Sequence, residues 1–165
     1  MSLIEFSQVL YDSEFGTALR ESVYAFPIVE GLHLISLAFS VGLILFVDLR
    51  LTGLFLRNVP VADILKPLRP WLLTGFVVTI STGIALFIAE ASKVIVISVF
   101  PLKILFILLA GINAIWFEHK WGRNSAEWGN LAAIPKGVKF AGLASITLWS
   151  GVVITGRLIP YFGYQ

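Results

Sequence analysis

Four long apolar segments, separated by shorter polar ones, organise this chain of 165 residues. We expect these segments to be membrane-spanning helices at about 22–49, 71–89, 102–117 and 140–157. Their lengths are close to the ~20 residues that a helix needs to cross the hydrocarbon core of a bilayer. Residues 1–20 are too short for a span, and their amphipathic pattern predicts a short helix at the membrane interface. The pattern therefore predicts an all-α fold: an integral membrane up-down four-helix bundle with a short N-terminal interfacial helix, in a single membrane domain, 1–165.

Prolines divide the polar segments between the spans. Pro60, Pro67 and Pro70 predict that residues 50–69 form a loop with a short helix at most, because proline interrupts a helix interior. Residues 91–100 are expected to be a brief connection at the interface. Pro101 follows them and is well placed to open the third span.

The composition agrees with a membrane location and indicates an orientation. Hydrophobic residues make up 58% of the chain and charged residues 13%, compared with about 25% charged residues in soluble domains. Lys and Arg are concentrated in the loops 50–69 and 118–139, so the positive-inside rule places both loops in the cytoplasm and both termini outside. The formal net charge of +2 and the lack of a basic run give no reason to expect nucleic acid as a partner.

An ionisable pair interrupts the first span. Glu30 and His33 are three residues apart, so they share one face of the helix. Polar side chains continue along this face at Ser22, Ser36, Ser40 and Asp48. Because an ionisable group in hydrocarbon costs at least a few kcal/mol, such a pair normally faces a partner, a cavity or a ligand. We interpret Glu30 and His33 as a functional site, against the simpler interpretation that they form an interhelical hydrogen-bond pair.

Haem is the ligand that the residue types favour. A neutral imidazole inside a bundle can ligate haem iron or another metal, and His33 is the expected ligand. Glu30 would orient its ring. Lys103 and Arg157, near the outer ends of their spans with Glu90, would suit the anionic groups of haem b. The sequence thus predicts a haem- or metal-binding, redox-linked protein for electron transfer, with an unidentified redox partner.

Other residues limit the possible ligand sets. His119 is the second of two histidines and lies at a different depth from His33, so a single axial histidine or His33 from two subunits fits better than a pair within one chain. Without cysteine, and with Met1 as the one methionine, a Cu(I) pathway is disfavoured. At the cytoplasmic edge, Asp48, Arg50 and His119, with Asn113, form a second polar group, in which we interpret Asp48 and Arg50 as interfacial anchors.

Two further functions remain open. Small residues form two stripes, Gly31/Ala38/Gly42 and Gly75/Thr79/Gly83. Such stripes let helices approach closely and suit a non-enzymatic, homo-oligomeric structural or accessory subunit. Glu30 and His33 would also serve a small proton-coupled transporter. No hydrolase or phosphate-binding motif is present, which leaves open whether the chain is an enzyme.

The combined motifs resemble an uncharacterised family of small bacterial four-helix integral membrane proteins. The resemblance extends over almost the whole chain and includes these residues: Leu19-Arg20-Glu21-Ser22, Phe26-Pro27, Glu30-x-x-His33, Gly42, Asp48-Leu49-Arg50-Leu51-x-Gly53, Thr82-Gly83, Lys103, Asn113 and Gly156-Arg157-Leu158-Ile159. It implies a multi-pass protein of the bacterial inner membrane, in which the positive-inside rule places both termini on the periplasmic side. The plan is also distantly similar to the membrane domain of copper-resistance D proteins and to four-helix b-type cytochromes, although the latter place paired histidines on facing helices.

Overall fold

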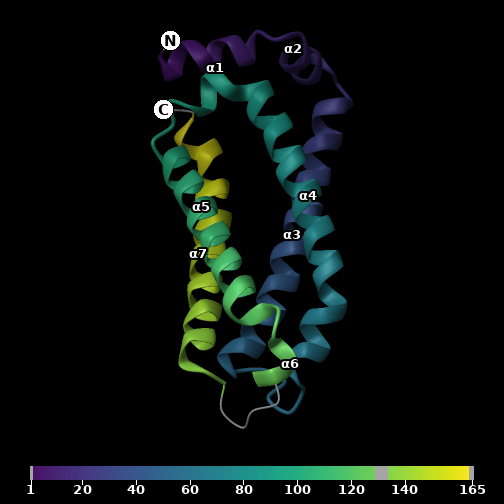
Figure 1. Cartoon of the computed structure of the whole chain (residues 1–165). Helices are drawn as coiled ribbons and strands as arrows, with labels where there is room; N and C mark the ends of the chain where they lie inside the picture. Colours follow the sequence, from purple (N-terminus) through teal and green to yellow (C-terminus); the bar gives the residue numbers. More distant parts are fainter. Residues whose placement is uncertain (1, 129–133, 164–165) are drawn as a thin grey trace.

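The computed structural model describes residues 2–128 and 134–163, and this part of the chain is helical with short connections (Figure 1). The elements in chain order are α1 (Leu3–Tyr11), α2 (Glu14–Glu21), α3 (Ala25–Thr52), α4 (Val61–Val94), α5 (Val99–Phe117), the π-helical turn η1 (Glu118–Gly122), α6 (Ser125–Trp128) and α7 (Lys136–Phe162). Four segments are long and apolar enough to cross a membrane: α3, α4, α5 with η1, and α7. Their lengths and hydropathy indicate a multi-pass membrane protein.

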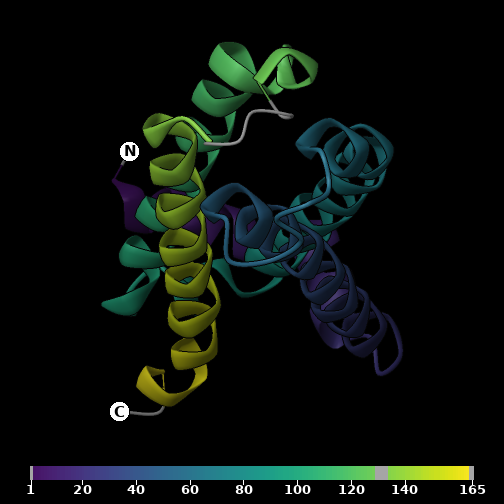
Figure 2. The ribbon, with the colours of Figure 1, turned by 90° about the horizontal axis from the view of Figure 1, so that it is seen from below.

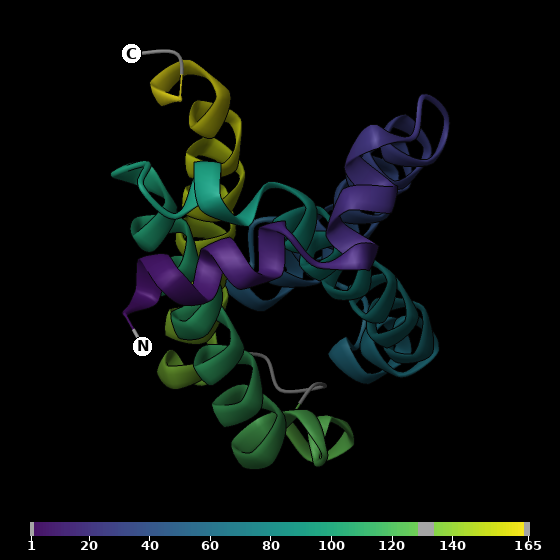
Figure 3. The same ribbon diagram turned by 90° about the horizontal axis from the view of Figure 1, so that it is seen from above.

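The four long helices pack as two pairs. α3 lies against α4 and α5 lies against α7, and contacts between α3 and α7 join the two pairs (Figures 1 and 2). α1 and α2 cross one end of the molecule, where α1 packs on α4 (Figure 3). We call this the capped end. α4 and α5 follow each other in the chain but belong to different pairs.

The main apolar core lies at the other end, which we call the core end. Its buried members come from α3, α4, α6 and α7: Val47, Leu51, Val61, Ile64, Leu65, Trp128 and Val138. Val61 and Val138 are at most 1% exposed. Buried apolar side chains therefore join α3 and α4 to α6 and α7 at the core end.

The predicted loop between the first two spans is wrong in its second half. α4 begins at Val61, directly after Pro60, and runs through Pro67 and Pro70. Each of these prolines removes one backbone hydrogen bond, but Ile64 and Leu65 on the same turns are buried in the core. Packing of this apolar face holds the backbone helical, which local propensity alone does not indicate.

Several other helix ends also extend beyond the predicted spans. α4 continues past residue 89 to Val94, with non-helical backbone angles at Glu90 (φ −121°, ψ 18°) that mark a kink. The expected connection at 91–100 is reduced accordingly. α3 ends at Gly53, whose φ of +78° is the left-handed conformation that glycine adopts most readily.

The N-terminal segment forms two short helices. Ser2 and Glu5 make a capping box on α1, and Ser13 caps α2. Arg20 of α2 ties the segment to the rest of the molecule: its Nη1 donates to the carbonyls of Tyr11 and Ala89, both at 2.9 Å. Its guanidinium also lies 3.7 Å from the centroid of the Tyr11 ring. That these helices lie at a membrane interface stays a prediction.

We expect Arg20→Met to loosen the cap without unfolding the bundle. The variant keeps the apolar stem but removes hydrogen bonds from a charged donor, which contribute about 1.5–3 kcal/mol. Limited proteolysis near residues 11–14 should become faster, while the thermal midpoint of the long helices changes little. Arg123→Met, at an exposed position, is the matched control. Unchanged proteolysis in Arg20→Met would contradict an anchoring role.

Candidate functional site

His33 lies on the face of α3 that packs against α4. Its Nδ1 is 3.0 Å from the carbonyl oxygen of Thr79 and 3.0 Å from Oγ1 of Thr82. The ring also lies close to Gly83, where an added Cβ would be 3.0 Å from its Cε1. Three residues of α4 thus hold the imidazole in one orientation.

These contacts assign the tautomer of His33. The Thr82 hydroxyl donates to the Val78 carbonyl at 2.7 Å, so its oxygen is available to accept from the ring. The Thr79 carbonyl accepts only. Nδ1 therefore carries the hydrogen, and Nε2 carries the lone pair. Metal-bound histidines use this arrangement, in which one ring nitrogen donates to the protein and the other binds the metal.

A row of polar contacts continues from His33 along the α3–α4 interface. Thr79 Oγ1 lies 3.0 Å from Ser36 Oγ, and Ser40 Oγ donates to the Ser36 carbonyl at 2.8 Å. Gly75 packs directly against Ser40. The Gly75/Thr79/Gly83 stripe therefore lets α4 approach α3 within the chain, as expected of small residues.

The small-residue stripe of α3 faces away from these contacts. A Cβ added at Gly31 or Gly42 would have no heavy atom within 4 Å among the described residues. Homo-oligomerisation through this face stays a prediction.

Lys103 and Arg157 are the cationic residues that we predicted near the outer ends of their spans. Of these two, Lys103 is the one that acts on His33. Lys103 is half-buried on α5, with its Nζ 3.6 Å from the position of a Cβ at Gly156 of α7. Its ammonium is close enough to act electrostatically on the His33 ring. His33 and Lys103 thus belong to different helix pairs.

The other residues that we predicted to act with His33 are Glu30, Arg157 and Glu90, and none of them forms a hydrogen bond with its ring among the described residues. Glu30 is exposed and also acts electrostatically on the His33 ring, but the hydrogen-bond partners of His33 Nδ1 are on α4. Arg157 is exposed, with its guanidinium 5.7 Å from the Tyr161 ring centroid. Glu90 forms an ion pair with Lys93 at 2.7 Å.

The second polar group does not form a single cluster. Arg50 Nε donates to the Val59 carbonyl at 2.7 Å, and Asn113 donates to the Ala141 carbonyl at 3.0 Å. His119 is exposed and contacts the Ile115 carbonyl on its own helix. Asp48 and Arg50 are 5% and 4% exposed, so interfacial anchoring does not describe them.

Comparison with known protein families gives a match for the chain. Residues 5–162 match the sequence profile of a family of unknown function, DUF6644. The chain belongs to this family. Comparisons with curated proteins and with solved structures give no match. Membership agrees with the resemblance to an uncharacterised family, while the likeness to copper-resistance D proteins and b-type cytochromes stays a prediction.

In this DUF6644 chain, sequence reasoning missed the residues that hold the His33 ring. Thr79 and Thr82 are the partners of His33, yet Thr79 was interpreted as part of a packing stripe. Their three-residue spacing next to Gly83 is the signal that could have indicated a ring-binding face. Across residues 2–128 and 134–163, no group of three His, Cys, Asp or Glu side chains lies in a metal-binding arrangement.

Proposed function

We propose that this protein binds haem b in the membrane, where His33 Nε2 would hold the iron, and takes part in electron transfer. The observation that supports this most directly is the attachment of Nδ1 to Thr79 and Thr82. It fixes the ring and leaves Nε2 as the basic nitrogen.

The surrounding residues fit this group. A porphyrin supplies four nitrogen ligands itself, so the protein needs to provide only one or two more. When bound, haem supplies one-electron chemistry at a potential that the axial ligand and burial set. Thr79 and Thr82 hold the histidine, and the absence of a side chain at Gly83 lets the imidazole pack closely against α4. Lys103 offers a cation for a propionate.

The membrane context is part of the proposal. The core end carries most of the Lys and Arg, so we place it in the cytoplasm and the capped end, with both termini, on the periplasmic side of a bacterial inner membrane. His33 would then lie in the outer half of the bilayer. A second ligand could come from His33 of another copy.

The His33 contacts would also serve a purely structural role, because they tie α3 to α4. The two roles differ in their use of Nε2. A haem ligand needs this nitrogen to bind the iron, whereas a histidine that only ties α3 to α4 does not use it. The accessory-subunit and proton-carrier interpretations likewise need no pigment, and the latter requires Glu30 to titrate during transport.

An absorption spectrum of the purified protein tests the proposal. Protein produced in cells with ample haem, and purified in an uncharged detergent, should show a Soret band that shifts when dithionite is added. Iron and haem assays on the same sample should give one haem for each chain or for each two chains. A colourless, metal-free preparation would contradict haem binding and favour the assembly or transport interpretations.

A further inference from the structure

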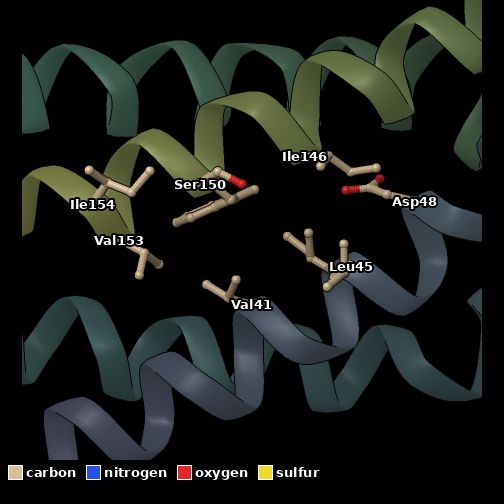
Figure 4. Close-up of a pocket in the computed structure, with 9 residues that line it drawn as sticks. Val41, Leu45, Asp48, Ile146, Ser150, Val153 and Ile154 are labelled. Carbon is tan, nitrogen blue, oxygen red and sulfur yellow. The ribbon is translucent and has the colours of Figure 1, made fainter.

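A second possible site lies between α3 and α7, toward the core end. A cavity of about 310 Å³ runs along the two helices and is lined almost entirely by apolar side chains (Figure 4). It is open on one side, where Leu45, Val153 and Ile154 are exposed. Its size is at the lower end of ligand-binding pockets, about 300–1,000 Å³. Leu45 and Ile146 are among its walls, and Asp48 lies at one end with its carboxyl group pointing into it.

The carboxyl group of Asp48 lacks a partner that would balance a charge. Asp48 is 5% exposed, and its Oδ2 has no hydrogen-bond partner among the described residues. The Ser145 hydroxyl of α7 is the polar group that acts on this carboxyl, and no charged side chain of α4, α5 or α7 in the described ranges does so. On its own helix, Arg50 directs Nε to the Val59 carbonyl. An ionised carboxylate in such surroundings is costly unless a positive group joins it.

Trp149 gives the cavity a second feature that suits a cation. It lines the cavity from α7, and its ring packs against Phe76 of α4 with centroids 4.8 Å apart. The face of an indole attracts cations, most strongly where water is excluded. An anionic group at one end and an aromatic ring along an apolar wall match a positive head on an apolar body.

We propose that this cavity binds a small organic cation, an amine or quaternary ammonium with an apolar or aromatic body, whose charge pairs with Asp48. Because an unpaired carboxylate is costly in these apolar surroundings, we expect the carboxyl to be protonated in the free protein. As the cation enters, the carboxyl O–H bond breaks and the proton is released to water. The carboxylate and the cation form an ion pair, so the net charge within the cavity stays at zero. The site is separate from His33 and does not depend on haem binding.

Binding of benzyltrimethylammonium tests this proposal. Equilibrium dialysis against the full-length protein in an uncharged detergent should show saturable binding. Because one proton leaves for each cation bound, the affinity should rise about tenfold for each pH unit while the free carboxyl is protonated. A weakly buffered sample should show proton release upon binding.

Variants separate the charge from the shape of the cavity. Asp48→Asn is nearly isosteric and should lose binding and proton release, while Asp63→Asn, on the exposed side of α4, should behave as the wild type. Trp149→Leu keeps the carboxyl and should weaken binding several-fold while retaining its pH dependence. Circular dichroism of each variant establishes that the helices are intact. Equal binding by Asp48→Asn, or no saturable binding by the wild type, would overturn the proposal.

Discussion

Replacing His33 with alanine is expected to abolish the Soret band of the purified protein. The substitution removes Nε2, the proposed iron ligand, and also the contacts of Nδ1 with Thr79 and Thr82. Loss of the ligand should leave haem at background level in a pigment assay. The spectrum and the haem-to-protein ratio, measured on protein purified in parallel with the wild type, are the readouts.

His119→Ala is the matched control for this prediction. His119 is exposed and contacts only the Ile115 carbonyl among the described residues, so its loss should leave the spectrum unchanged. Imidazole added during purification of His33→Ala should restore part of the band, since it can occupy the space left by the side chain. Full haem content in His33→Ala would contradict the assignment of His33 as the iron ligand. Loss of haem in both variants would contradict the expectation that His33 alone of the two histidines is required.

Gly142→Leu is expected to separate the two helix pairs. Gly142 of α7 lies directly against α3, where an added Cβ would be 3.2 Å from Cβ of Leu51 and 3.3 Å from the backbone oxygen of Asp48. A leucine side chain cannot be accommodated by moving a flexible neighbour, because one of these atoms belongs to the α3 backbone. We expect a loss of about 3 kcal/mol or more in the free energy of unfolding, near the upper range for overpacking.

Denaturant-induced loss of helix, followed by circular dichroism in mixed micelles, measures this effect. Gly142→Ala should cost less, because a single methyl group requires shifts of only a few tenths of an ångström. Gly111→Leu on α5 is the control, since a Cβ there has no described heavy atom within 4 Å. Equal stabilities for the two leucine variants would show that α3 and α7 are not held together at Gly142.

Hydropathy predicted the four long helices because each carries a sustained apolar pattern. It did not predict the beginning of α4, where Pro67 and Pro70 indicate a break and the burial of Ile64 and Leu65 outweighs them. That burial depends on α3, α6 and α7, which are distant in sequence. Local signals therefore placed the spans but not their ends.

The candidate site shows the same limit. The position of His33 within an apolar helix was enough to mark it, and its face followed from the helical period. Its partners could not be identified, because Glu30, three residues away, was the nearest polar candidate, while the contacts come from Thr79 and Thr82 on α4. Asp48 was interpreted as an anchor because its sequence position is near a helix end. Its burial depends on α7, almost one hundred residues later.

The buried apolar cluster at the core end is one place where the two helix pairs are held together, and a change in the angle between the pairs would pivot there. α3 has 28 residues, so at 1.5 Å per residue the helix is ~42 Å long. A tilt of ~5° between the pairs would displace their far ends by ~4 Å while each pair stays rigid. His33 belongs to the α3/α4 pair and Lys103 to the α5/α7 pair, so this tilt changes the distance between them. The spacing of the two groups therefore depends on the angle between the two helix pairs.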